Sequence, residues 1–169
     1  DYIKKNFSDG YIFFSNTLKF TGIGESAVSE KIENLLKLKN PTVAPYANLG
    51  EFKLRITARA KNEFEAKNLI KPVKDKLKKE FSKYIFGEDN DDLSSVLIKE
   101  LRKRKESFGF AESCTGGLLS STITKVSGSS QVFKGSIISY SNELKQSLLN
   151  IPENLIKKYG AVSEEVAQN

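Results

Sequence analysis

Histidine, methionine and tryptophan are absent from this chain of 169 residues, and cysteine occurs once, as Cys114. Without histidine, the chain cannot build a Ser-His-Asp or Cys-His catalytic centre or a histidine-based zinc site. A single cysteine excludes an intrachain disulfide and a cysteine-based zinc site, and it agrees with a cytoplasmic location. Any acid–base catalysis within the chain therefore has to use Lys, Tyr, Asp, Glu or Ser side chains.

Long apolar runs and a signal peptide are also missing. No apolar stretch approaches the roughly 18 residues that cross a membrane, and the N-terminal residues carry no signal-peptide pattern. With 28% charged and 38% hydrophobic residues, the composition is typical of a globular protein without membrane segments. Because the chain lacks methionine and begins at Asp1, we expect it to be a piece of a longer protein.

The positive charge is concentrated in the first half. Residues 1–87 contain 17 Lys and Arg against 10 Asp and Glu, whereas residues 88–169 contain 10 against 11. The change coincides with the acidic segment 87–92, which is typical of a linker or of the start of a helix. We therefore predict two domains, 1–87 and 88–169.

The first half alternates strand and helix patterns. Strands are predicted at 11–20 and 84–86, which are rich in aromatic and β-branched residues, and at 51–60, where apolar residues alternate with others. Two helices are predicted between the strands. One runs from Ser26 to the stop at Asn40-Pro41, and the other is capped by Asn62 and kinked or divided by Pro72. The pattern predicts a small α+β domain of the βαββαβ kind.

The second half also alternates. A helix is predicted from about Asp92, followed by a strand at 108–111, a helix through 118–123 and a buried apolar strand at 135–140. Three more helix starts follow, with Asn142 as a cap, Pro152 in a first turn and a capped start at 163–167. The order predicts an α/β layered domain, an αβα sandwich, whose C-terminal part is missing.

The most informative segment is 111–117, Ala-Glu-Ser-Cys-Thr-Gly-Gly, at a predicted junction of strand and helix. Such a junction exposes side chains at the sheet edge, and the N–H groups of a helix start favour an anion there. Paired glycines also allow a ligand to approach the backbone. The segment is equally well explained as an ordinary capped helix start. Within it, we interpret Cys114 as a small packing residue rather than a nucleophile.

Lys145 follows the next junction, Tyr140-Ser141-Asn142-Glu143. Successive strand-to-helix turns of a parallel sheet lie at the same edge, so Ser113 and Lys145 could meet there. A serine nucleophile needs a base, which lysine can supply in a chain without histidine. A lysine that acts as a base near neutral pH must titrate about 3 pH units below its ordinary pKa of about 10.4, and burial favours this. The simpler interpretation is a solvated helix lysine.

Three motifs resemble the competence/damage-inducible CinA family: 111–117, 140–143 with Lys145, and 159–167 (Tyr-Gly-Ala-Val-Ser-Glu-Glu-Val-Ala). The segments 20–26 (Phe-Thr-Gly-Ile-Gly-Glu-Ser) and 40–47 (Asn-Pro-Thr-Val-Ala-Pro-Tyr-Ala) are similar to the KH-like middle domain of that family. The resemblance extends over nearly the whole chain, with the motifs in the same order.

The resemblance implies that 88–169 is the start of a nicotinamide-nucleotide amidase domain. Such domains hydrolyse nicotinamide mononucleotide to nicotinate mononucleotide and ammonia, in pyridine nucleotide salvage, without a metal or cofactor. Carried over, Ser113 is the nucleophile, Lys145 is its base, and Tyr140 assists proton transfer or orientation. Contacts to the substrate or its oxyanion are implied for Glu112, Thr115, Gly116, Gly117 and Asn142. The family also suggests a homodimer.

Two departures from the family pattern stand out. Full-length members carry an N-terminal domain that resembles molybdopterin-binding proteins and is associated with ADP-ribose pyrophosphatase activity, and nothing in this chain matches it. The amidase domain also normally continues beyond 160–167 into further strands and a glycine-rich loop that helps to form the pocket. This leaves open whether the piece is active by itself.

An alternative function is nucleic-acid binding or dimerisation by the basic residues 1–87. Their positive charge favours loose attraction of phosphates. A KH domain, however, clamps RNA with a Gly-x-x-Gly loop, and Gly22-Ile23-Gly24-Glu25 has the wrong spacing. We therefore expect a solvated lysine-rich surface on a spacer or dimerisation domain, and neither nucleic acid nor a membrane as a partner. The ligand that the family resemblance implies is a small nucleotide.

Overall fold

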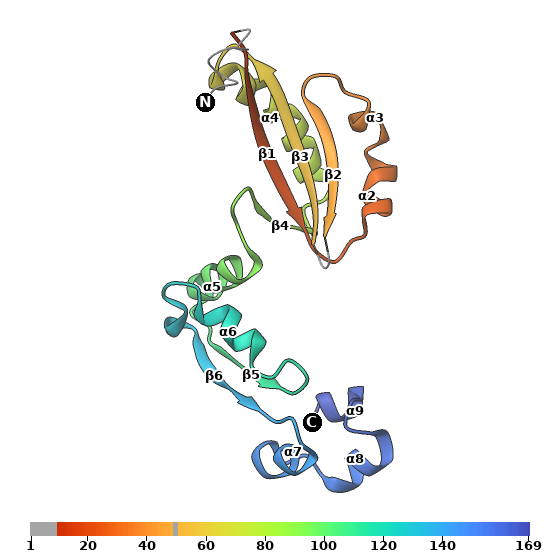
Figure 1. Cartoon of the computed structure of the whole chain (residues 1–169), viewed down its shortest axis with the longest axis vertical. Coiled ribbons are helices and arrows are strands. Elements are labelled where there is room, and N and C mark those ends of the chain that lie inside the picture. Colours follow the sequence, from red (N-terminus) through yellow and green to blue (C-terminus); the bar gives the residue numbers. More distant parts are fainter. Residues whose placement is uncertain (1–9, 49–50) are drawn as a thin grey trace. The chain divides into compact units, whose positions relative to one another are not determined.

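The chain divides into two compact units, Asp1–Leu93 and Ser94–Asn169, and each is described by itself (Figure 1). The computed structural model describes residues 10–48 and 51–169, so residues 1–9 and 49–50 of the predicted first domain lie outside the described part. The first unit contains an antiparallel sheet and the second a parallel sheet, both with helices. The predicted mixed fold class is confirmed.

A four-stranded sheet in the order β2-β3-β1-β4 forms the first unit. Strand β1 lies in the middle and pairs antiparallel with both β3 and β4, while β2 pairs with β3 alone. The elements in chain order are β1 (Ile12–Phe20), α2 (Glu25–Lys31), α3 (Glu33–Leu36), β2 (Thr42–Asn48), β3 (Glu51–Ala60), α4 (Glu63–Glu80) and β4 (Ile85–Glu88).

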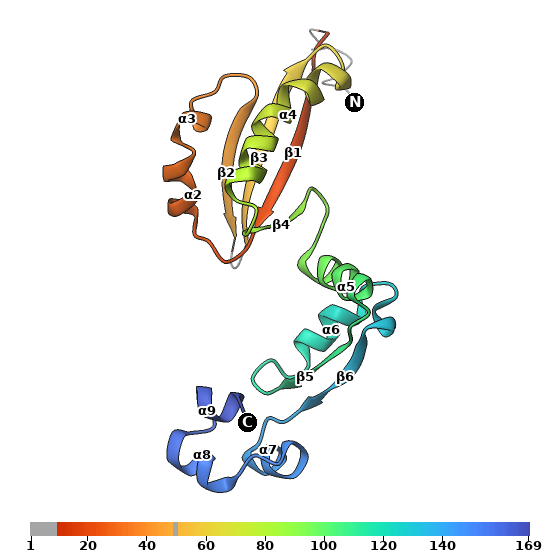
Figure 2. The ribbon, with the colours of Figure 1, turned by 180° about the vertical axis from the view of Figure 1, so that it is seen from behind.

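The core of this unit lies between one face of the sheet and its helices. Alternate residues of β1 and β3, such as Leu18 and Ile56, are fully buried, and they pack with Ile70 and Leu77 of α4 and with Val28 of α2. Figure 2 shows α4 lying across this face. Because the side chains of a strand alternate between the two faces of the sheet, every second residue of β1 and β3 lies on the face opposite the core.

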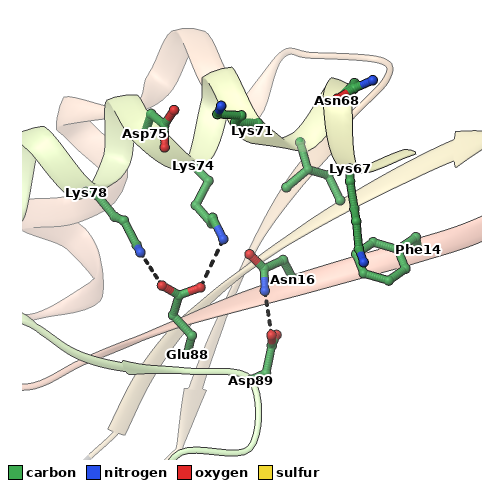
Figure 3. A pocket seen from close by; sticks show the side chains of 11 residues that line it. Phe14, Asn16, Lys67, Asn68, Lys71, Lys74, Asp75, Lys78, Glu88 and Asp89 are labelled. Atoms are coloured by element: carbon green, nitrogen blue, oxygen red, sulfur yellow. Dashed lines mark hydrogen bonds and ion pairs between the residues drawn. The ribbon is translucent and has the colours of Figure 1, made fainter. Parts of the chain in front are cut away.

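The acidic segment that was predicted to be a linker is bound to the first unit. Glu88 forms ion pairs with Lys74, at 3.1 Å, and with Lys78, both from α4. Asp89 accepts a hydrogen bond from Asn16 Nδ2 at 2.5 Å (Figure 3). Burial alone would raise the pKa of Glu88, but the two ammonium groups hold it below its ordinary value. These contacts explain why the division between the units falls after Leu93.

The second unit contains a two-stranded parallel sheet, β5 with β6. Ile98, Ile123 and Val132 form one small apolar cluster, and Ile151, Ile156 and Val166 form another. The elements in chain order are α5 (Leu93–Arg104), β5 (Phe108–Glu112), α6 (Leu118–Thr124), β6 (Phe133–Ile138), α7 (Asn142–Leu149), α8 (Glu153–Tyr159) and α9 (Glu164–Ala167), with a 3-10 turn at Ser129–Gln131. The three layers of an αβα sandwich stay a prediction.

Several local predictions need correction. Strand β6 begins two residues earlier than predicted and is not a buried strand, since Ile137 and Ile138 are 39% and 45% exposed; in the described sheet it pairs only with β5. Pro72 lies within the continuous helix α4, and the first predicted helix is split at Ile32 into α2 and α3. The cap of α7 is Ser141 rather than Asn142, because the Ser141 hydroxyl accepts the hydrogen bond from Leu144 N–H.

Within the described residues, no helix combines the length and the apolar character that crossing a membrane requires.

Candidate active site

The segment 113–117 forms a tight turn that connects β5 to α6. Gly116 and Gly117 have φ angles of +56° and +97°, in the left-handed region where a side chain is strained. A Cβ atom on Gly117 would also lie 3.0 Å from Ile138 Cδ1. The backbone conformation of the turn therefore requires the paired glycines. Ser113, at the start of this turn, lies directly at the end of β5.

A single buried carboxylate holds this turn together. Glu112 is 2% exposed, and its carboxylate accepts hydrogen bonds from the Thr115 hydroxyl and from the N–H groups of Gly117, Leu119 and Ser120, at 2.8 to 3.1 Å. The Ser120 hydroxyl is a further donor. Burial of the carboxylate raises its pKa, but these hydrogen bonds to the charged form outweigh that effect and lower the pKa of Glu112 to about 2.

The contacts of Glu112 change the roles that were expected for its neighbours. Glu112 and Thr115 were predicted to contact substrate, yet the structure uses both side chains to hold the turn, as it does the N–H of Gly117. The Gly116 N–H donates to the Ser113 carbonyl. The N–H groups of Cys114 and Thr115 have no hydrogen-bond partner in the described part of the chain, and of these two residues Cys114 lines the pocket described below.

Lys145 extends from α7 toward the turn and is 6% exposed, which rules out the solvated helix lysine. Its Nζ lies 3.1 Å from Ser113 Oγ and donates to the backbone carbonyls of Ser139 and Tyr140 at 2.8 and 3.0 Å. Among the described residues it forms no ion pair with a carboxylate. The structure thus brings together the two residues that the sequence selects as nucleophile and base.

Ser113 and Lys145 line a pocket of about 470 Å³. The lining also includes Glu112, Cys114 and Ser139, and much of the rest is apolar, namely Leu149, Ile151, Ala161, Val162, Val166 and Ala167. Lys145 is the single cationic residue of the lining, and Glu112 the single acidic one. The pocket therefore combines one nucleophile–amine pair with a mostly apolar surface, which suits a flat organic group.

Five predicted residues do not line the pocket, namely Tyr140 and Asn142 together with Thr115, Gly116 and Gly117 of the turn. The Tyr140 side chain is 73% exposed, and its part in the site is the backbone carbonyl that accepts from Lys145. Asn142 is the exposed first residue of α7 and does not line the pocket. Cys114 is exposed at the pocket rather than packed in a core, contrary to the interpretation from the sequence. The carbonyls of Ser139 and Tyr140 were missed, because sequence patterns report side chains.

Comparison with known proteins accounts for both halves of the chain. Residues 15–87 match the family model of the damage-inducible protein CinA KH domain, and residues 90–169 match that of the CinA C-terminal domain. The chain belongs to the CinA family. Among its relatives, a CinA-like protein of Prochlorococcus marinus (strain MIT 9515) is 88% identical over 100% of this chain and 39% of its own length. The CinA-like protein of strain MIT 9215 is 77% identical over 99% of this chain and 40% of its own length.

The chain thus spans about two-fifths of the length of these curated CinA relatives. Among solved structures, it is similar to the competence/damage inducible protein CihA from Agrobacterium tumefaciens, with 32% identity and a TM-score of 0.44 over 45% of this chain and 46% of that one.

Proposed function

We propose that this chain contributes the nucleophile and the base of a nicotinamide-nucleotide amidase, which hydrolyses nicotinamide mononucleotide to nicotinate mononucleotide and ammonia. The observation that carries the proposal is the distance of 3.1 Å between Lys145 Nζ and Ser113 Oγ at a pocket. This distance is within the range for direct proton transfer between a nucleophile and its base. The family resemblance supplies the substrate, and the pair supplies a chemistry that needs no histidine.

The proposed mechanism requires Lys145 to accept a proton from Ser113, and therefore to start as the free amine. In this form its two N–H groups would donate to the carbonyls of Ser139 and Tyr140, and the nitrogen lone pair would take the Ser113 hydroxyl proton. As the proton moves to Nζ, Ser113 Oγ bonds to the amide carbon and the carbonyl oxygen becomes an oxyanion. The ammonium of Lys145 then returns the proton to the leaving nitrogen, ammonia departs, and a serine ester remains. Lys145 then takes a proton from water as the water oxygen bonds to the ester carbon, and it returns that proton to Ser113 Oγ as the ester bond breaks, so that the nicotinate product leaves and both residues are regenerated.

Charge on the oxyanion requires hydrogen-bond donors that other groups have not used. The N–H groups of Cys114 and Thr115 meet this condition, whereas those of Gly116 and Gly117 are bonded within the turn. Removing one such donor in serine hydrolases costs about 10²–10³ in kcat. In our proposal the backbone at 114 and 115 therefore takes the role that the sequence assigned to 115–117.

The wider assignments belong to the same proposal. The amidase acts in pyridine nucleotide salvage in the cytoplasm, as a homodimer and without a cofactor, and the longer protein also carries an ADP-ribose pyrophosphatase domain. The KH-like unit is a spacer or dimerisation element. These assignments follow from the resemblance of the motifs, and none of them is needed for the chemistry of Ser113 and Lys145.

The test is release of ammonia from nicotinamide mononucleotide, measured on this chain and on the longer protein that contains it. We expect Ser113→Ala to lower kcat by at least about 10³-fold and Lys145→Ala by about 10²- to 10⁴-fold. Circular dichroism should show that both variants are folded. EDTA should leave the rate unchanged, because the proposed steps use side chains alone.

Three neighbouring variants serve as controls. Cys114→Ala and Asn142→Ala should retain activity, and Tyr140→Phe should retain it within about threefold, because its carbonyl rather than its hydroxyl contacts Lys145. Activity that survives Ser113→Ala, or that disappears in Cys114→Ala, would contradict the proposed nucleophile. Loss of activity in Tyr140→Phe alone would return the tyrosine hydroxyl to the mechanism.

A further inference from the structure

Strand β1 has an unpaired edge along its first half. Strand β4 pairs with β1 only at residues 18–20 of β1, and Figure 1 shows β4 beside that end of the strand. Just before it, the Asp89 N–H donates to the carbonyl of Thr17, whose own N–H donates to the Asp89 carboxylate. No strand of the described sheet pairs with residues 12–16 on this side. We call this stretch of β1 the free edge.

Phe13 and Ser15 direct their backbone groups to the free edge. Along an antiparallel strand, the N–H and C=O groups of successive residues point alternately to its two sides. Since those of Thr17 bond to Asp89 on the β4 side, those of Phe13 and Ser15 point to the same side. Within residues 10–48 and 51–169, these four groups have no hydrogen-bond partner. The free edge therefore offers two N–H donors and two C=O acceptors to another strand.

The sequence of the free edge lacks the features by which edge strands usually avoid pairing. Charged residues and proline protect such edges, and β2, the strand at the other edge of this sheet, contains Pro45. Residues 12–16 read Ile-Phe-Phe-Ser-Asn, without charge, proline or glycine. The Phe13 side chain is also 73% exposed. This part of β1 is therefore suited to the addition of a further strand.

A pocket of about 630 Å³ lies beside the free edge, on the face of the sheet that α4 covers (Figure 3). Phe14 and Asn16 of β1 form part of its lining. Lys67 extends from α4 toward β1, with its Nζ 5.3 Å from the centre of the Phe14 ring, and it also pairs with Glu63 at 2.6 Å. Because both side chains of that ion pair are more than half exposed, the pair is weak, and Lys67 can receive a second carboxylate.

The charges around this pocket favour an acidic partner. Four lysines line it, against the three acids Asp75, Glu88 and Asp89. Two of these acids are already bonded within the unit, since Glu88 pairs with Lys74 and Lys78 and Asp89 is bonded to β1. The whole chain has a formal net charge of +6, so a second copy is repelled at long range, whereas an acidic segment is attracted.

We propose that the free edge binds an extended peptide in which acidic and apolar residues alternate. The peptide adds to the sheet as a further antiparallel strand, through hydrogen bonds to the backbone of Phe13 and Ser15. Paired residues of neighbouring strands share a face, so the peptide residue beside Phe14 directs its side chain to the pocket, where a carboxylate meets Lys67. Its two neighbours lie on the other face, where the exposed Phe13 ring favours apolar side chains.

The experiment measures the fluorescence anisotropy of a labelled peptide, Thr-Val-Glu-Val-Glu-Val-Thr, titrated with the whole chain. We expect saturable binding at low salt that weakens at least about threefold at about 0.5 M salt, because salt screens exposed charges. In the proposed pairing the valine nitrogens face the free edge and the glutamate nitrogens face away from it. Methylation of the valine nitrogens should therefore abolish binding, whereas methylation of the glutamate nitrogens should not.

Variants of the chain test the same contacts. Ser15→Pro removes an N–H group that faces the free edge, and it should weaken binding at least about tenfold. Phe13→Ala should weaken it about two- to fivefold, and Lys67→Ala by a similar factor of about two to five. Tyr46→Ala on β2 and Lys76→Ala on α4, which lie outside the free edge and the pocket lining, are the controls and should leave affinity unchanged.

Circular dichroism checks the fold of each variant, and if Ser15→Pro does not fold, the two methylated peptides decide. Absence of saturable binding at low salt would overturn the proposal. So would equal binding of the two methylated peptides, because the backbone of the free edge would then be unused. Self-association of the chain that Ser15→Pro abolishes, without binding of the peptide, would assign the free edge to a second copy instead.

Discussion

At the scale of single residues, two buried ionisable side chains, Glu112 and Lys145, shape the candidate site. The Glu112 carboxylate accepts its hydrogen bonds from its own turn rather than from a ligand. Lys145 donates to main-chain carbonyls and faces Ser113. Proximity of Ser113 and Lys145 could be predicted from the sequence, because parallel strands place their junctions at one edge. The role of Glu112 could not be predicted from the sequence, because it depends on the direction in which the carboxylate points at the end of β5.

Glu112 should make stability depend on pH in acid. Its pKa in the folded chain, about 2, lies below the ordinary value of 4.5, so its stabilising contribution is complete above about pH 4.5 and is lost as the pH falls toward 2. We expect Glu112→Gln to lower the melting temperature at neutral pH and to flatten its dependence on pH between about 5 and 3.

The control for this measurement is Glu106→Gln, which removes an exposed carboxylate from the segment between α5 and β5. Its melting curve should follow that of the unchanged chain at every pH. If the melting temperature of Glu112→Gln depended on pH as steeply as that of the unchanged chain, the turn would not rely on the charged form of Glu112.

At the scale of elements, residue patterns predict most helices and strands. The other elements and limits depend on the strands with which a segment pairs. Strand β3 and the start of α9 at Ser163 follow from alternation and capping patterns that the structure confirms. Strand β2, with Pro45 within it, carries no such pattern, but it lies at the edge of the sheet, where proline is tolerated. The limits of β6 were wrong because an apolar run does not reveal where pairing with β5 stops.

The cap of α7 gives a test at this scale, because α7 carries Lys145. Ser141→Ala should lower the free energy of unfolding by about 1 kcal/mol, since the N–H of Leu144 loses its acceptor. Asn142→Ala, one residue further along, should change it by less than about 0.5 kcal/mol. Urea unfolding of the two variants measures the difference, and a larger effect of Asn142→Ala would contradict the observed cap.

At the scale of the whole molecule, the two units differ in how much apolar surface they bury. The first has one continuous cluster that joins β1, β3 and α4, whereas the second has two small clusters, around Ile98 and around Ile156. The predicted boundary at 87/88 rests on charge, while the compact units divide at Leu93, since charge patterns do not show that Glu88 and Asp89 are held by α4 and β1.

Hydrogen exchange should reveal this difference. We expect the amides of β1 and β3 to exchange at least about 100-fold more slowly than those of β5 and β6. Ile56→Ala should destabilise the first unit by about 2–5 kcal/mol and leave exchange in β5 and β6 unchanged. Equal acceleration in both units would mean that they unfold as one cooperative body.

The bonding of Glu112 also bears on substrate selectivity. The amide hydrogens at the start of α6, which would otherwise attract a phosphate, are already neutralised by a carboxylate of the protein itself. Lys145, whose side chain also lines the pocket, faces Ser113. In the proposed reaction this pocket receives the pyridinium ring and the amide of the nucleotide, and neither the α6 amides nor Lys145 is then available to its phosphate.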